Sequence, residues 1–475
     1  MCYFLTSVHS ELKFFKNCFM LFKKMNVLLV NPWIYDFAAY DLWLKPVGLL
    51  KIASFLERFG YRVHIVNCLE RNHPLLKKKY NFFSQREFDC GKFFSQEVEK
   101  PILLKDIPRK YKRYGIPPDI FEEELSKVPL PLLAVGITSG MTYWYPGVFE
   151  VIGKIKERFP SVPIVLGGIY ATLCPEHARK LSGADYVVKG RGEISFLKIL
   201  DGICGIRRDY SKIHLEKEDE RTIPSYHLLR DVKSVAMLTS RGCPLRCSYC
   251  ASHLLEEKFI QYPPEKVIAE IEYYVEKLKV KDIAFYDDAL LLNPERHIIP
   301  ILEKVIKKFK GKVRFHTPNG LHTRFVDRKI AKLFYAAGFK TIRLSFESVC
   351  PKIQKTSCNK VTESDLLEAI KILVNAGYKR KDIGVYIMVG LPEQTLEEVM
   401  QTVKFVLKEG VTLKIAEFSP IPGTAEFKKA LEKTSLPLDK EPLLQNNSTF
   451  FLWNKNITLN DLLRIKNLIK KGGKA

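Results

Sequence analysis

Short apolar runs alternate with amphipathic segments along the first 200 residues of the chain. Runs such as 27–30, 132–137 and 163–166 are bounded by turn residues, which is typical of strands buried on both faces of a parallel sheet. The segments 46–59 and 148–158 carry apolar residues at helical spacing. Strands that alternate with helices predict a doubly wound, Rossmann-like α/β domain, in which ligands lie beyond the carboxyl ends of the strands.

A second alternating series begins near residue 235. Its predicted strands are 235–238, 282–285, 313–316, 341–345, 384–388 and 413–417, and the predicted helices between them are 264–278, 294–309, 328–337, 363–375 and 396–408. Such a row of βα units predicts a partial (β/α)6 TIM-like barrel, with its chemistry at the carboxyl ends of the strands.

The chain of 475 residues is too long for one ordinary domain. An aromatic and basic stretch interrupts the first series, and we expect it to be an insertion with short helices of its own. The predicted organisation is an N-terminal extension (1–24), an α/β domain (25–200, with the insertion at about 71–131), a linker (201–233), the barrel core (234–433) and a helical C-terminal tail (434–475).

The chain carries 76 basic and 53 acidic residues, a formal net charge of +23. This charge favours an anionic partner such as nucleic acid, a membrane surface or an acidic substrate. Because the lysines are scattered along the whole chain, they also fit a charged surface that has no such partner.

The cysteine count and the lengths of the apolar runs bear on location. The number of cysteines is odd, at 11, and no secretory signal is recognisable, which predicts reduced thiols and a cytoplasmic protein. No apolar run reaches the ~18 residues that a membrane span needs, so no transmembrane span is expected. The apolar and basic segment 1–24 is interpreted as an extension, with a weak amphipathic anchor as the alternative.

Three cysteines stand directly after the first predicted barrel strand. Cys243, Cys247 and Cys250 have the spacing C-x3-C-x2-C. Three thiolates with no fourth nearby suit a [4Fe–4S] cluster that leaves one iron open. A zinc site completed by His253 and free thiols in the core are the alternatives.

This motif and the barrel after it are similar to the radical S-adenosylmethionine (SAM) superfamily, over about residues 234–433. The resemblance implies that the three cysteines bind a [4Fe–4S] cluster and that SAM chelates the open iron. It places Tyr249 at the aromatic position that faces the adenine. It also implies SAM contacts at the ends of later strands, from Asp287, Asp288, Glu347, Ser348 and Gly390. In the 389–395 turn Glu393 replaces the usual glycine, and Ser345 replaces the glycine of the 345–348 segment.

The first domain resembles the cobalamin-binding domain that precedes the barrel in one large subgroup of that superfamily. The matching features are Asn31-Pro32, the turn at 48–50, Gly167-Gly168 and the glycine-rich segment 190–193. The resemblance implies that these loops hold the corrin and its nucleotide tail, through Gly167, Gly168, Gly190, Gly192, Glu193 and Trp144. For Trp144, packing in an ordinary aromatic cluster is the alternative. The Asp-x-His-x-x-Gly motif that supplies a cobalt ligand elsewhere is absent, as it commonly is in this subgroup.

The resemblance implies a radical SAM enzyme with three cofactors: a [4Fe–4S] cluster, SAM and cobalamin. A reduced flavodoxin- or ferredoxin-like donor supplies the electron, and the chemistry comes from the cofactors. We expect methyl transfer to an unactivated carbon of a small molecule, lipid precursor or peptide. Two alternatives remain: a radical SAM enzyme that modifies RNA without functional cobalamin, and a non-catalytic iron–sulfur or cobalamin-binding module.

Overall fold

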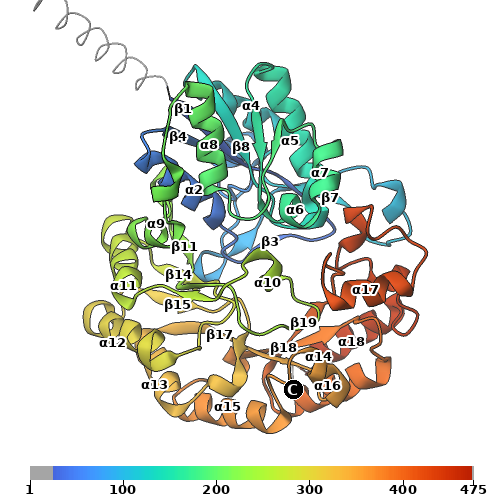
Figure 1. The fold of residues 1–475 in the computed structure, drawn as a ribbon. Coiled ribbons are helices and arrows are strands. Elements are labelled where there is room, and N and C mark those ends of the chain that lie inside the picture. The colour runs from blue at the N-terminus through green and yellow to red at the C-terminus, as the bar shows by residue number, and fades with distance from the viewer. Residues whose placement is uncertain (1–24, 473–475) are drawn as a thin grey trace, which may run out of the picture.

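The computed structural model describes residues 25–472, and Figure 1 shows its two large β-sheets, one in the upper and one in the lower half of the molecule. The first sheet is parallel, with the strand order β10-β9-β8-β1-β4. Its strands are β1 (Asn26–Asn31), β4 (Arg62–Asn67), β8 (Leu132–Ile137), β9 (Ile164–Leu166) and β10 (Tyr186–Val187). The chain passes from β1 to β4 on one side and then to β8 on the other, so the winding direction reverses between β1 and β8. Doubly wound sheets bind ligands at this reversal.

Helices cover both faces of the first sheet because successive strand residues point to opposite sides. Val27 and Leu29 are fully buried in the core that includes α2 (Val47–Arg58) and α8 (Glu193–Cys204). Leu28 and Val30 are buried in the other core, which includes α4 (Pro118–Ser126), α5 (Tyr145–Arg158), α6 (Gly168–Leu173) and α7 (Pro175–Leu181). The predicted doubly wound α/β domain is therefore confirmed.

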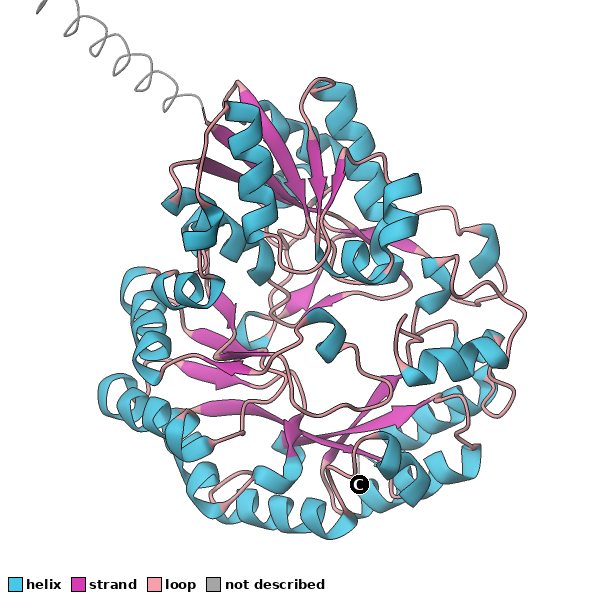
Figure 2. Ribbon diagram, viewed as in Figure 1, coloured by secondary structure: helices cyan, strands magenta, loops and turns pink. Residues whose placement is uncertain are grey.

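The second sheet is the open barrel, with the order β11-β14-β15-β17-β18-β19 and β16 paired beside β17. The strands are β11 (Ser234–Met237), β14 (Asp282–Phe285), β15 (Arg314–His316), β16 (Leu321–His322), β17 (Phe339–Glu347), β18 (Ile383–Val389) and β19 (Thr412–Glu417). Figure 2 shows helices along its outer side. They are α11 (Pro264–Glu272), α12 (Ile298–Phe309), α13 (Arg328–Ala337), α15 (Glu363–Asn375) and α16 (Leu396–Lys408). Since β11 and β19 do not pair, the barrel is partial, as predicted.

The insertion contains short strands as well as helices. Besides α3 (Pro74–Tyr80) and α4 it holds β5 (Gly91–Lys92), β6 (Ser95–Glu97) and β7 (Lys112–Tyr114), which pair with one another or with β2 (Ile34–Asp36) and β3 (Tyr40–Asp41). The insertion also reaches the barrel, because the Phe88 ring centroid lies 5.0 Å from that of His316. Asp89 accepts a hydrogen bond of 2.6 Å from the Ser234 hydroxyl at the start of β11.

Several elements differ from the sequence-based expectation. The predicted helix 264–278 ends in a π-helical turn at Tyr273–Lys277, and the predicted helix 294–309 is interrupted at His297. Helix α8 continues to Cys204, four residues beyond the expected end of the first domain at 200, and the linker contains α9 (Leu215–Arg221).

The C-terminal tail, expected to be helical, is a long helix only over α18 (Leu459–Gly472). Between 434 and 458 it forms two 3-10 turns, η10 (Pro442–Gln445) and η11 (Phe450–Leu452), in an otherwise irregular path. Its apolar residues Leu444 and Phe450 are fully buried against the barrel, so packing rather than helical periodicity sets this conformation.

The predicted extension 1–24 lies outside the described residues. Within residues 25–472, none of the helices combines the length and apolar character that crossing a membrane requires.

Candidate cofactor sites between the two sheets

A cavity of about 480 Å³, the seam cavity, lies between the two sheets. Pro32, Ser139 and Gly168 line it at the carboxyl ends of β1, β8 and β9, together with Trp144. From the barrel it is lined by residues at or near the carboxyl ends of the first three strands: Ala236, Leu238, Tyr286, Asp288 and Asn319. It therefore lies at the winding reversal of the first sheet and at the mouth of the barrel at once.

A smaller cavity of about 170 Å³, the glycine cavity, adjoins the seam cavity through Gly48, Leu49, Thr138 and Gly168. It is lined by five of the six residues predicted to bind cobalamin: Gly167, Gly168, Gly190, Gly192 and Glu193. Gly168 has a φ of 88°, and a Cβ there would lie 2.6 Å from the Ser139 carbonyl oxygen. The structure thus gathers these residues at one place, although it does not test what they bind.

Trp144, the sixth predicted cobalamin residue, lines the seam cavity. Its indole Nε1 donates a hydrogen bond of 2.8 Å to Oδ2 of Asp36. The other carboxylate oxygen of Asp36, Oδ1, accepts a hydrogen bond from the backbone nitrogen of Phe37. Burial raises the pKa of Asp36, and the hydrogen bond from Trp144 opposes this shift. The indole is therefore fixed in the cavity wall by a specific partner.

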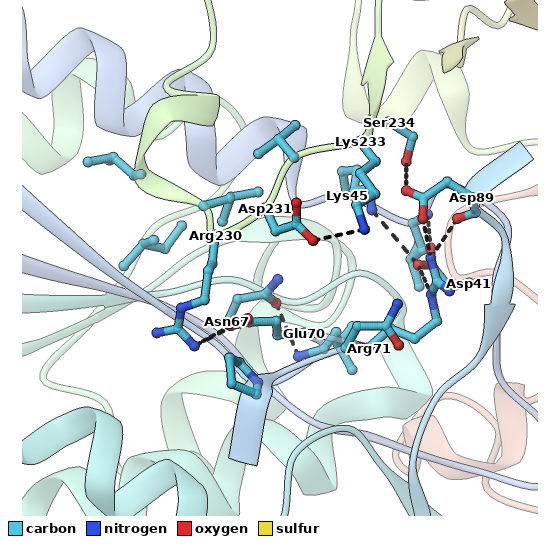
Figure 3. A pocket seen from close by; sticks show the side chains of 18 of the residues that line it. Asp41, Lys45, Asn67, Glu70, Arg71, Asp89, Arg230, Asp231, Lys233 and Ser234 are labelled. Atoms are coloured by element: carbon cyan, nitrogen blue, oxygen red, sulfur yellow. Dashed lines mark hydrogen bonds and ion pairs between the residues drawn. The ribbon is translucent and has the colours of Figure 1, made fainter. Parts of the chain in front are cut away.

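A third cavity, of about 510 Å³, lies beside the linker and is drawn in Figure 3. It touches the seam cavity through Leu44, Lys45 and Leu69. The cations in its wall have carboxylate partners: Lys45 and Arg71 pair with Asp41, Arg71 also with Asp89, Arg230 with Glu70 and Glu124, and Lys233 with Asp231. Its charges are thus satisfied within the protein.

The cysteine loop connects β12 (Ser240–Arg241) to α10 (Ser252–Leu255). It begins at Gly242, whose φ is 71° and where a Cβ would lie 2.6 Å from the Lys258 carbonyl oxygen, so the turn requires glycine. The middle of the loop is held at Ser248, whose amide donates 2.8 Å to the Thr356 carbonyl and whose hydroxyl donates 2.8 Å to Glu426. The barrel thus fixes the loop from two later segments, α14 (Pro351–Thr356) and α17 (Ala425–Glu432).

A buried ion pair lies beside the thiols. Lys360 Nζ lies 2.8 Å from Glu347 Oε1 and 3.3 Å from the Tyr249 hydroxyl. Burial raises the pKa of the Cys247 thiol to about 12, and the charge of Lys360 opposes this rise. Burial also raises the pKa values of Cys243 and Cys250. A positive charge next to the loop favours the thiolate form that ligates iron.

The two predicted aspartates have different surroundings. Asp287 is buried and accepts hydrogen bonds from the Thr239 amide and hydroxyl and from the Ser240 hydroxyl, at 2.6–3.1 Å. Burial raises its pKa to about 6, which these hydrogen bonds limit. Asp288 is exposed at the wall of the seam cavity and accepts from the Ser252 hydroxyl. Asp287 therefore ties β14 to the start of the cysteine loop, whereas Asp288 faces the cavity.

Ser348 and Gly390, also predicted to contact SAM, lie among protein partners. The fully buried Ser348 hydroxyl is 3.1 Å from the Thr402 hydroxyl and accepts from the Cys350 amide. Gly390 has a φ of 99°, and a Cβ there would lie 2.8 Å from the Phe450 ring. The SAM contacts of these two residues stay predictions.

The donor set of the cysteine loop fits an iron–sulfur cluster by its chemistry, since it offers three thiols on one short segment. Within residues 25–472, no three histidine, cysteine or acidic side chains converge in an arrangement that could hold a metal ion. The assignment of Cys243, Cys247 and Cys250 as ligands therefore rests on their spacing and on the family.

Two family models match the chain, "Radical SAM superfamily" over residues 237–406 and "B12 binding domain" over residues 119–200. The chain belongs to the cobalamin-binding branch of the radical SAM superfamily. The radical SAM match contains the cysteine loop, and the B12 match contains five of the six glycines that line the glycine cavity. The cofactors of this radical SAM protein are therefore a [4Fe–4S] cluster, SAM and cobalamin.

Curated relatives include several proteins named as methyltransferases. An uncharacterized methyltransferase of Pyrococcus horikoshii is 29% identical over 70% of this chain and 74% of its own length. The bacteriochlorophyllide d C-12(1)-methyltransferase of Chlorobaculum tepidum is 23% identical over 57% of this chain and 60% of its own. The anaerobic magnesium-protoporphyrin IX monomethyl ester cyclase of Rubrivivax gelatinosus is 25% identical over 56% of this chain, and the match spans about half, 53%, of that enzyme.

The fold is shared with solved radical SAM proteins. The methyltransferase TsrM of Kitasatospora setae, solved with cobalamin and a [4Fe–4S] cluster, has a TM-score of 0.64 at 16% identity, over 90% of this chain and 81% of its own. The cobalamin-dependent radical enzyme OxsB, solved with aqua-cobalamin, has a TM-score of 0.57 at 14% identity, over 96% of this chain and 62% of its own.

Four residues of the site escaped the sequence analysis. Lys51, Arg191 and Arg241 line the glycine cavity, and Lys360 lies beside the cysteine loop. They come from segments far apart in the chain, and a lysine or arginine in a basic sequence carries no positional signal. Arg191 had one local clue, because it stands between the two glycines of the 190–193 segment.

Proposed function

We propose that this protein transfers a methyl group from SAM, by way of cobalamin, to an unactivated carbon of its substrate. The observation that carries the proposal is the seam cavity, whose wall is shared by the first sheet and the barrel mouth. A corrin held over the ends of β1, β8 and β9 would face the strand ends that carry the cysteine loop. Methyl transfer requires this juxtaposition, because the methyl donor and the activated carbon must meet.

When bound, the cluster and SAM supply the radical that activates the carbon, and cobalamin carries the methyl group. The chain's own residues position these groups. Asp287 fixes the start of the cysteine loop through Thr239 and Ser240, and Glu426 fixes its middle through Ser248. Buried apolar residues line the cavity on both sides, Trp33 from the first domain and Ala236 from the barrel, and would keep water from reactive species. A small flavodoxin- or ferredoxin-like protein is the electron donor that suits this chemistry.

The barrel interior favours a substrate with a negatively charged group. Arg343 lies on β17 and Lys414 on β19, on either side of β18. In the strand register, Arg343 is paired with Gly384 of β18, and Lys414 is paired with Tyr386 of β18. A Cβ at Gly384 would lie 2.5 Å from Arg343 Nη1, so the glycine provides the space for the guanidinium. Burial lowers the pKa of both cations, and Arg343 lowers that of Lys414 further. Within residues 25–472 neither forms a salt bridge.

The proposal is tested by two products that do not require the substrate to be known. The protein is reconstituted anaerobically with iron, sulfide and hydroxocobalamin, reduced, and mixed with SAM. We expect S-adenosylhomocysteine that depends on added cobalamin and 5′-deoxyadenosine that depends on the cluster. A Cys247→Ala variant should lose the deoxyadenosine. Deoxyadenosine without any cobalamin-dependent S-adenosylhomocysteine would contradict methyl transfer and favour a radical SAM activity of another kind.

A further inference from the structure

The amino ends of the barrel strands form a continuous surface at the end of the barrel opposite the cysteine loop. In a parallel barrel the segments that lead into successive strands meet at this end. Two backbone hydrogen bonds join them across neighbouring strands: the Arg314 amide donates 2.8 Å to the Lys281 carbonyl, and the Phe315 amide donates 3.2 Å to the Gly338 carbonyl. Segments that are 30 or more residues apart in the chain therefore lie side by side.

This surface is strongly basic. The segments that lead into β14, β15 and β18 carry seven exposed lysines, the rim lysines: Lys277, Lys279, Lys281, Lys310, Lys312, Lys379 and Lys381. Within residues 25–472 none of them has a carboxylate within 4.0 Å. The nearby Glu276 and Glu409 pair with other cations, Lys308 and Arg380, and Asp382 is the one carboxylate between 379 and 382. Lysines that are scattered in the sequence are thus gathered by the fold.

A cavity on the outer side of the barrel leads to the rim lysines. It measures about 260 Å³ and is lined by Arg328 and Lys332 from α13 and by Ile372, Asn375 and Ala376 at the end of α15. Both cations are exposed, and in the described part of the chain neither has a carboxylate within 4.0 Å. Because β17 follows α13 and β18 follows α15, the ends of both helices point to the rim.

An exposed aromatic ring lies between this cavity and the rim. Tyr335 continues the row of Arg328 and Lys332 along α13, at spacings of four and three residues. Its side is 54% exposed. The ring lies against Gly377, where a Cβ would be 2.8 Å from it, and its centroid is 5.4 Å from that of Tyr378. The ring is therefore fixed by the protein while it stays open to solvent.

These features favour a single-stranded nucleic acid over other anionic partners. Surface lysines supply the contacts that a phosphate backbone needs, and a fixed aromatic ring beside them supplies a surface on which any base can stack. A membrane surface is bound through several apolar side chains as well as through cations. In the described parts of the rim, α13 and α15, the large exposed hydrophobic side chains are Tyr335 and Leu367.

We propose that the amino end of the barrel binds single-stranded nucleic acid, with its phosphates on the rim lysines, Arg328 and Lys332 and with a base stacked on Tyr335. The seam cavity and the cysteine loop lie at the carboxyl ends of the strands, so the nucleic acid is a docking partner and not the substrate. This second binding function goes beyond the proposed methyl transfer and does not depend on it.

The test measures the binding of labelled oligouridylate and oligodeoxythymidylate of about 16 nucleotides to the full chain by fluorescence anisotropy. Both should bind saturably, and the affinity should fall as salt rises because bound phosphates release counterions. The two probes distinguish RNA from DNA. Polyglutamate and vesicles that contain phosphatidylglycerol test the two other kinds of anionic partner, and both should bind at least about tenfold more weakly.

Tyr335→Ala should weaken oligonucleotide binding about tenfold without a change in the salt dependence, while Tyr335→Phe should bind as wild type. Tyr186→Ala, which removes a 44% exposed tyrosine of the first domain, is the matched control and should have no effect.

The double variant Lys312→Gln/Lys379→Gln should weaken binding and reduce the slope of log affinity against log salt by about 1.4, as expected for two lost phosphate contacts. Lys180→Gln, which removes an exposed lysine on α7, is its control and should keep both the affinity and the slope.

Absence of oligonucleotide binding at low salt would overturn the inference. So would wild-type affinity in both Tyr335→Ala and the double lysine variant, which would place the nucleic acid elsewhere. Binding of polyglutamate as tight as that of the oligonucleotides would show a general polyanion surface, and tighter binding to the vesicles would show a membrane surface. Either result would overturn the nucleic-acid assignment and leave the proposed methyl transfer intact.

Discussion

Lys360 and Glu347 form an ion pair of 2.8 Å directly beneath the cysteine loop, with exposed side-chain fractions of only 11% and 8%. Glu347 stands at the end of β17 with a φ of 71°, a strained conformation for a non-glycine residue. Although burial lowers the pKa of Lys360, Glu347 and then the thiol of Cys247 raise it above the usual value. The pair therefore links a predicted SAM contact to the predicted cluster ligands.

Removal of one partner should destabilise the protein because it leaves a buried charge. We expect Lys360→Met to lower the free energy of unfolding by about 3 kcal/mol or more, as measured by urea denaturation of the protein without cofactors. The double variant Lys360→Met/Glu347→Gln should recover part of the loss. Equal stabilities of wild type and Lys360→Met would show that the pair is not closed in solution.

Gly242 should tolerate no side chain. With a φ of 71° and a Cβ position 2.6 Å from a carbonyl oxygen, Gly242→Ala should lower the free energy of unfolding by at least ~1 kcal/mol. It should also reduce iron incorporation, because Cys243 follows directly. The matched control is Gly153→Ala in α5, where no atom lies within 4 Å of a Cβ; there alanine should be neutral or slightly stabilising. Normal iron content in Gly242→Ala would contradict the strained turn.

Asp287 should make stability depend on pH. Burial raises its folded-state pKa to about 6 from 3.8, so between these values the folded protein holds a proton that the unfolded chain has lost. Its contribution to stability therefore falls as the pH rises from about 4 to about 6. Burial lowers the pKa of His297 from 6.5 to about 4. Its contribution to stability therefore rises as the pH rises from about 4 to 6.5.

The contribution of Asp287 is isolated by comparison of wild type with Asp287→Asn. Urea denaturation at several pH values should show that the variant gains stability relative to wild type between pH 4 and 6. A constant difference over this range would mean that Asp287 ionises normally.

The barrel cations should bind anions. Small carboxylates and phosphates should raise the melting temperature of the wild-type protein more than their neutral amides and alcohols do, since a bound ligand stabilises the folded state. Arg343→Met should abolish the difference, while Lys340→Met, on an exposed position of the same strand, should keep it. Identical shifts for charged and neutral compounds would argue against an anionic substrate.

The alternation of apolar runs and amphipathic segments predicted both sheets, because fully buried strands such as β8 and β18 carry a strong pattern. The cysteine spacing predicted the loop that the family model also contains. Strands of two or three residues, such as β3 and β5, were not predictable, since they are too short to show a period. The same holds for η10 and η11, whose conformation depends on packing against the barrel.

The cations that line the glycine cavity illustrate a different limit. Lys51 and Arg241 are separated by 190 positions in the sequence, and only the docking of the barrel against the first domain brings them into one wall. A half-buried lysine such as Lys51 on an amphipathic helix looks like an ordinary surface lysine until the opposing domain is present. Pattern analysis within one element cannot supply that contact.

The central claim is that one chain holds both a [4Fe–4S] cluster and cobalamin. Its most direct test is a count of iron and cobalt per chain after anaerobic reconstitution with iron, sulfide and hydroxocobalamin, followed by desalting. We predict about one cobalt and four irons per chain. Cys247→Ala should lose iron and keep cobalt, and Trp144→Ala should lose cobalt and keep iron. Four irons without cobalt in the wild-type protein would contradict the account and leave a radical SAM barrel whose first domain does not use cobalamin.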